Sequence, residues 1–95
     1  MKTPVICSDN YVVYLEHFEG ASFIHCDCFG WTKAIKTALL EDLSCLFSIH
    51  RRPVYAVHDI GDKKHLKFLH LVGFTFHSTF IGIDNIMRHF YTRGS

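Results

Sequence analysis

The stretch that decides the fold is GWTKAIKTALLEDLSCLFSIHRRPVYAV, residues 30–57. Apolar residues recur in it at steps of three and four, which is the spacing of one helical face. These residues are Trp31, Ile35, Ala38, Leu39, Leu43, Leu46, Phe47 and Ile49. Thr32 is the expected N-cap, and Pro53 prevents the helix from continuing much beyond His50. Val54–Val57 then reads as a short buried strand, so a strand before the helix would pair with it in parallel.

The residues before this helix predict a β-hairpin. Two runs rich in β-branched and aromatic residues, 11–18 and 21–29, flank the turn signal Glu19-Gly20. Strand side chains alternate with period two, so Cys26 and Cys28 share one face and His25 lies on the other. Within residues 1–10, we expect at most an edge strand at 5–7, before a turn at 8–10.

The residues after 57 predict a second helix and a second hairpin. Asp62 is suited to cap a helix that runs to Val72, and Gly73 supplies the left-handed residue that ends it. Residues 74–81 and 86–92 read as strands joined by a turn at 82–85. The order β-β-α-β-α-β-β predicts one α/β (α+β) domain over residues 1–95. Its mixed sheet would hold antiparallel hairpins around a parallel central pair, with 93–95 as a frayed end.

Composition excludes several classes of protein. Hydrophobic residues make up 48% of the chain, which excludes intrinsic disorder. The longest runs without charge fall short of the roughly 20 apolar residues of a membrane-spanning helix, and the N-terminus does not resemble a signal peptide. Ten Lys and Arg face nine Asp and Glu, a formal charge of +1 that argues against a nucleic-acid binder. We therefore expect a protein that stays where it is made.

The cysteines invite a metal or thiol interpretation. Four cysteines without a secretory signal read as reduced thiols. The segment His25-Cys26-Asp27-Cys28 is dense in metal ligands, but the strand period turns His25 away from both thiols, and structural zinc sites use Cys-x₂₋₄-Cys turns. No thiol stands at a helix N-terminus with a base beside it. We expect neither a metal site nor a catalytic cysteine.

A family resemblance rests on residues 54–74, VYAVHDIGDKKHLKFLHLVGF. The helix pattern His65-Leu66-Lys67-Phe68-Leu69 and the stop Gly73-Phe74 follow an aromatic strand and a polar loop. This order resembles the C-terminal half of the GNAT N-acetyltransferase fold. More narrowly, it is similar to the short GNAT-like proteins of tailed phages, including podovirus internal virion proteins. The resemblance covers about residues 22–92 and implies a truncated GNAT-like domain of phage origin.

The resemblance also places the family's functional positions. GNAT enzymes hold the pyrophosphate of acyl-CoA on a Gln/Arg-x-x-Gly-x-Gly/Ala loop at the start of their central helix. The matching stretch here is residues 27–32, which keeps Gly30 but begins with Asp27. The tyrosine that the family often uses as an acid falls on Leu69. The departures imply a scaffold without cofactor and without confident catalytic residues.

The resulting function hypothesis is macromolecular binding. A phage protein of this kind would bind a host complex as a counter-defence inhibitor, for example anti-CRISPR-like, or serve as a virion component, in the host cytoplasm or the virion. Because aromatic and Arg side chains dominate binding hot spots, the candidate partner contacts are Trp31, Arg51, Arg52, Phe80, Arg88 and Tyr91. An incomplete parent fold would also leave a sheet face uncovered, which favours a partner or a homodimer.

The alternative hypothesis is an acyl-CoA-dependent N-acetyltransferase that uses acetyl-CoA. Its cofactor residues would be Gly30, Trp31, Thr32 and Lys33. Lys36 in the same helical turn would add anion affinity. The base would be His58 or His70, with Asp59 placed to orient His58 at the carboxyl end of a strand.

Overall fold

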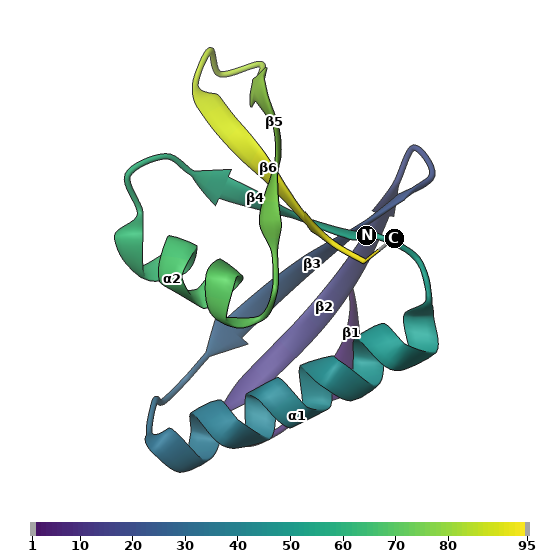
Figure 1. The fold of residues 1–95 in the computed structure, drawn as a ribbon, viewed down its shortest axis with the longest axis vertical. Helices are drawn as coiled ribbons and strands as arrows, with labels where there is room; N and C mark the ends of the chain where they lie inside the picture. The colour runs from purple at the N-terminus through teal and green to yellow at the C-terminus, as the bar shows by residue number, and fades with distance from the viewer. Residues whose placement is uncertain (1, 95) are drawn as a thin grey trace.

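The computed structural model describes residues 2–94 as one mixed six-stranded sheet with two helices (Figure 1). The elements are β1 (Lys2–Cys7), β2 (Tyr11–Phe18), β3 (Ala21–Cys28), α1 (Lys33–His50), β4 (Val54–Asp59), α2 (Lys63–Leu71), β5 (Thr75–Ile81) and β6 (Met87–Arg93). The strand order is β1-β2-β3-β4-β6-β5. The predicted α/β class, with a mixed sheet and two helices, is confirmed. The N-terminal edge strand is longer than expected, and pairs with β2 through an irregularity between Pro4 and Ile6.

The local signals for the two helices act as predicted. The Thr32 side chain accepts a hydrogen bond from the backbone N–H of Ile35 at 3.2 Å, and the Asp62 carboxylate accepts one from that of His65 at 3.1 Å. Gly73 has a φ of +87°, and the backbone leaves α2 there. These caps fix where each helix begins, and so which of its residues face the sheet.

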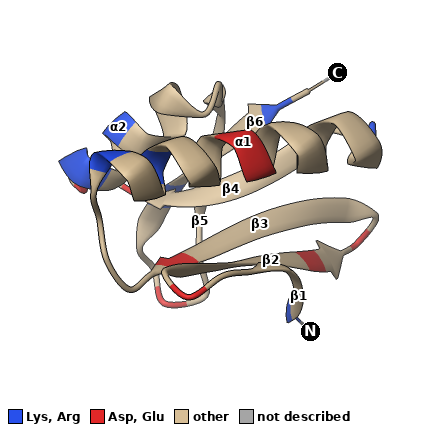
Figure 2. Cartoon of the chain, turned by 90° about the horizontal axis from the view of Figure 1, so that it is seen from below, with Lys and Arg blue, Asp and Glu red and all other residues tan. Residues whose placement is uncertain are grey.

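Both helices cover the same face of the sheet, as Figure 2 shows from the side. This follows from two right-handed crossovers in one direction, β3-α1-β4 and β4-α2-β5. The buried apolar residues between sheet and helices are Tyr11, Val13, Leu15, Leu39, Leu43, Val54, Ala56, Leu69, Val72, Phe74 and Tyr91. The core thus joins both halves of the sheet through one layer of side chains.

The face of α1 that packs is narrower than the sequence predicted. Leu39 and Leu43 are buried, whereas Ile49 is 80% exposed. Ile49 lies ten residues after Leu39, which at 100° per residue turns it about 80° away from the buried face. Trp31 precedes the N-cap and is half exposed. The apolar face predicted for this helix therefore included one residue too many at each end, Trp31 and Ile49.

The other face of the sheet carries no helix among residues 2–94 and is lined by aromatic side chains. Phe23 on β3 lies 5.9 Å from Tyr55 on β4 and 5.7 Å from Phe90 on β6, measured between ring centroids. Phe80 on β5 stacks on Phe90 at 4.2 Å. We call Phe23, Tyr55, Phe80 and Phe90 the aromatic row. It joins four strands on the side of the sheet that the helices leave open.

Arg93, the first residue of the expected frayed end at 93–95, is ordered in β6. Arg93 is the last residue of β6, and its guanidinium lies 4.2 Å from the centre of the Phe47 ring. This contact ties the end of the sheet to α1. Ser95 lies outside the described residues. Neither α1 nor α2 has the length and apolar character to cross a bilayer, within residues 2–94.

Candidate functional site

The central parallel pair of strands opens into a cleft. β3 and β4 are paired only at Ser22 with Val54 and at Phe23 with Tyr55. Beyond these pairs the two strands diverge, as the arrowheads in Figure 1 show. The cleft between them has a volume of about 990 Å³. It is large enough for a cofactor-sized ligand.

Besides β3 and β4, the elements β1, α1 and α2 contribute residues to the cleft walls. The apolar lining includes Ile24, Leu43, Ala56, Val57, Phe68, Leu69, Leu71, Val72 and Phe74, with Trp31 just ahead of α1. The edges of β3 after Phe23 and of β4 after Tyr55 face each other without a ladder pair in the described register. Their backbone N–H and C=O groups are therefore available to an amide-bearing ligand. The cleft combines an apolar lining with two rows of polar backbone groups.

The charged residues of the cleft are mostly basic. Its lining includes four lysines, Lys2, Lys36, Lys64 and Lys67, against one carboxylate, Asp27. The whole chain has a formal charge of only +1, so this concentration is local. Figure 2 shows basic segments on both helices at the same side of the molecule. A lysine-lined cleft attracts anions, and phosphates in particular.

The predicted cofactor positions fall mostly outside this cleft. Of Gly30, Trp31, Thr32 and Lys33, only Trp31 lines it. The Thr32 hydroxyl already caps α1, and a Cβ at Gly30 would meet its nearest atom, Cδ1 of Ile35, at 3.7 Å. There is therefore room for a side chain at position 30, and the packing does not require a glycine there. Lys36, one turn into α1, is the basic residue of this segment that reaches the cleft.

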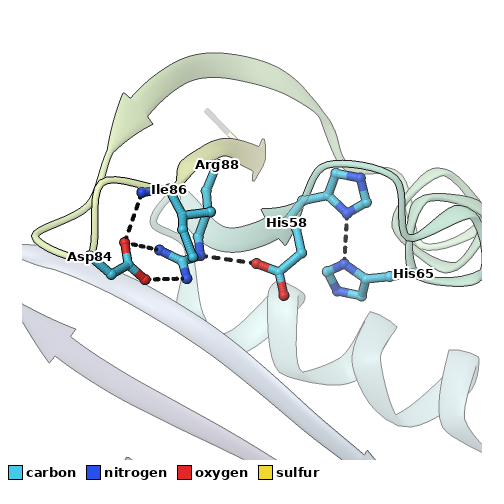
Figure 3. A network of polar contacts seen from close by, with 6 residues as sticks. His58, His65, Asp84, Ile86 and Arg88 are labelled. Atoms are coloured by element: carbon cyan, nitrogen blue, oxygen red, sulfur yellow. Dashed lines mark hydrogen bonds and ion pairs between the residues drawn. The ribbon is translucent and has the colours of Figure 1, made fainter.

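The two predicted bases, His58 and His70, also lie outside the cleft lining. His58, on β4, is only 3% exposed and packs against His65 of α2 and Tyr91 of β6. Its Nδ1 lies 2.9 Å from Nδ1 of His65, so one ring donates and the other accepts (Figure 3). His70 is exposed on α2, with its ring 6.1 Å from that of Tyr91. Two other histidines line the cleft, His25 and His65, and neither was predicted from the sequence as a base.

Asp59 does not orient His58 as expected. Its Oδ1 accepts a hydrogen bond from Nε of Arg88 at 3.0 Å, while the other Arg88 nitrogens bind the Asp84 carboxylate at 3.1 and 2.7 Å (Figure 3). The hydrogen bonds from Arg88 lower the pKa of Asp84. This network fastens the β5–β6 turn to the end of β4. Arg88 is thus occupied within the chain.

Burial lowers the pKa of His58, and the neighbouring His65 and His89 lower it further, against opposing effects of Asp62 and Asp59. Unfolded chains therefore take up this proton at a higher pH than the folded protein. We expect the free energy of unfolding to fall as the pH drops through and below the ordinary pKa of histidine, about 6.5. Urea unfolding at pH 7.5 and about 5.5 measures the loss. In His58→Gln the loss should shrink, whereas in the matched variant of exposed His70, His70→Gln, it should persist. Equal losses in His58→Gln and wild type would contradict the assignment.

The predicted partner contacts are dispersed over the molecule. Trp31 precedes α1 and Arg51 and Arg52 follow it, at opposite ends of an 18-residue helix about 27 Å long. Phe80 stacks in the aromatic row, and Tyr91 is 7% exposed and belongs to the core. Burial leaves little of Tyr91 for a partner. These residues therefore do not form one surface.

The thiols and other metal ligands do not gather into a larger cluster. No group of three or more His, Cys, Asp or Glu side chains is placed to hold a metal ion among residues 2–94. All four cysteines are free, and Cys26 and Cys28 both line the cleft. Burial raises the pKa of Cys26 to about 12, with a further contribution from Cys28. Cys26 is thus a neutral thiol at pH 7.

Comparisons of the chain with protein-family models, with curated proteins and with solved structures found no match.

Proposed function

We propose that this chain is a GNAT-like protein that binds a ligand of the acyl-CoA class in the cleft between β3 and β4. The observation that carries the proposal is the opening of a parallel strand pair into a lysine-lined cleft. Ligands of open α/β sheets bind where neighbouring strands separate at their carboxyl ends. The sequence patterns favoured a partner-binding scaffold without a cofactor. The cleft instead favours acetyl-CoA, the cofactor of the alternative hypothesis.

The residues of the cleft fit the chemistry of acyl-CoA part by part. Lys36, Lys64 and Lys67 would attract its phosphates, since lysine is a common phosphate ligand. The unpaired edges of β3 and β4 offer hydrogen bonds to the two amides of the pantetheine arm. Apolar residues such as Phe68 and Leu71 would contact the methyl groups of that arm and the acyl chain. Asp27 is the one cleft residue that opposes an anion.

Binding without acyl transfer is the form of this function that the site supports. Leu69 occupies the position of the tyrosine that the family often uses as the general acid. It is 2% exposed, and its side chain cannot donate a proton. Neither His58 nor His70 lines the cleft. His65 does, but its Nδ1 is engaged with His58. His25 also lines the cleft, and its Nε2 lies 3.0 Å from Oε1 of Glu16. An acyl-CoA would supply an activated thioester here, and both cleft histidines are engaged in contacts within the chain.

Ligand-dependent thermal unfolding tests this proposal. Acetyl-CoA at 100 times its Kd should stabilise the folded protein by about 2.7 kcal/mol. Cys28→Trp should abolish the stabilisation, because the indole would fill the cleft from its β3 wall. Cys45→Trp is the matched control, since Cys45 is also exposed but does not line the cleft. No stabilisation of the wild type at millimolar acetyl-CoA would reject the proposal.

A second candidate function is favoured by the aromatic row. Four aromatic rings on a helix-free sheet face fit the expected role of a protein that binds a host complex or assembles in a virion. The partner would be a protein, because the chain lacks the basic excess that nucleic acid needs. A homodimer through the same face is a variant of this function.

Affinity capture from infected cells and light scattering test the second candidate. Proteins retained by the wild type should be lost from Phe80→Arg but kept by Ile49→Arg, whose side chain is 80% exposed on α1. Light scattering should report a dimer only if the partner is a second copy. Identical captures by wild type and Phe80→Arg would discard this face.

A further inference from the structure

Two thiols stand side by side on the β3 wall of the cleft. Cys26 and Cys28 are two residues apart on an extended strand, which places both side chains on the same face. Their sulfur atoms lie 3.8 Å apart. Cys28 is exposed and Cys26 half-buried, and both line the cleft. The pair is therefore accessible to a ligand that enters it.

The spacing of the sulfurs fits a chelated metal ion. Two thiolates that bind one tetrahedral Zn²⁺, each at about 2.3 Å, have their sulfurs about 3.8 Å apart. The distance in the folded protein is the same, so an ion could bind without movement of β3. A disulfide would require the sulfurs to approach to about 2.05 Å. Chelation therefore requires less displacement of the two sulfurs than a disulfide does.

We propose that Cys26 and Cys28 form a dithiol site that chelates one thiophilic divalent ion of the Zn²⁺ and Cd²⁺ kind. Each ion forms two metal–sulfur bonds, and the two thiol protons leave to solvent. Since no third protein donor joins the pair among residues 2–94, the remaining coordination positions face water or a cleft ligand. Catalytic zinc sites keep one position open beside three protein ligands, so a tetrahedral ion held by this pair would keep two. This proposal does not depend on acyl-CoA binding.

The chain carries its own controls for this site. Cys7 and Cys45 are also free and exposed, but neither lines the cleft. Cys7 lies on edge strand β1 and Cys45 on α1, so neither has the same-strand neighbour that Cys26 and Cys28 give each other. General reactivity of thiols with soft metals would involve all four residues. A dithiol site would involve only the pair on β3.

Titration with Cd²⁺ under reducing, chelator-free conditions tests the proposal, with the ultraviolet charge-transfer absorption of cadmium thiolate as the readout. We expect a stoichiometry of one ion per chain in the wild type and in the double variant Cys7→Ser/Cys45→Ser. Cys28→Ser should remove this saturable absorption, and because Cys28 is exposed the variant should fold. Cys26→Ala provides a second variant, checked by circular dichroism. Absorption that survives in Cys28→Ser, or that disappears in Cys7→Ser/Cys45→Ser, would overturn the proposal. Zn²⁺ in large excess should compete with Cd²⁺ at the same site, because Cd²⁺ is the softer ion and binds thiolates more tightly. Cadmium absorption that does not decline at any excess of Zn²⁺ would exclude the zinc assignment.

Discussion

Replacing Leu39 by Ala is expected to lower the free energy of unfolding by about 2–5 kcal/mol. Leu39 is fully buried on α1, within the layer of side chains between the helix and the sheet. The substitution removes apolar contacts and leaves a cavity that the surrounding strands can only partly fill. For a domain of this size, such a loss is a large share of the total stability. Urea unfolding at pH 7.5 measures it.

Ile49→Ala is the matched control for this prediction. It removes a similar apolar side chain from the same helix, but Ile49 is 80% exposed. We expect a change within about 0.5 kcal/mol. Comparable losses for the two variants would mean that the packed face of α1 is assigned wrongly. The orientation of α1 over the cleft would then be wrong as well.

Reversing two cleft charges, Lys36→Glu with Lys64→Glu, is expected to weaken acetyl-CoA binding by about 30-fold or more. Each substitution replaces an attraction of phosphate by a repulsion, and the two lysines lie on different helices that line the same cleft. The wild-type affinity should also fall as salt is added, because the charges are near solvent. Calorimetric titration at two ionic strengths measures both effects.

The control reverses two neighbouring lysines that do not line the cleft, Lys33→Glu with Lys63→Glu. The net charge changes equally in the two double variants, so a long-range effect of charge would appear in both. We expect the control to bind within a few-fold of the wild type. Equal weakening in both variants would show that the phosphates are not held at Lys36 and Lys64. The acetyltransferase hypothesis named both Lys33 and Lys36, and the comparison separates Lys33 from Lys36, which the cleft contains.

The elements of the fold were predictable because their signals are local. Thr32 and Asp62 satisfy backbone N–H groups within three residues, and Gly73 adopts a positive φ that few other residues tolerate. Pro53 stops α1 whatever the rest of the chain does. These positions fixed the order of helices and strands. The end of the buried face at Ile49 was missed because it depends on how the sheet lies beneath the helix.

The candidate site was less predictable because it is made by divergence of two strands. No local pattern shows that β3 and β4 separate after Phe23 and Tyr55, and the separation brings Lys36, Lys64 and Lys67 to one cleft. Likewise, His58 pairs with His65 rather than with the adjacent Asp59, which Arg88 engages from β6. The spacing of Cys26 and Cys28 was the exception. Strand periodicity alone placed both thiols on one face.

Mapping acetyl-CoA onto the protein by backbone amide chemical shifts tests the central claim most directly. The claim predicts saturable shifts in the diverging parts of both strands, at 24–28 and 56–57, and in the lysine-bearing turns of α1 and α2. The aromatic row on the opposite face should shift much less. No shifts at millimolar acetyl-CoA, or shifts confined to that opposite face, would contradict the claim that this cleft is a binding site for acyl-CoA.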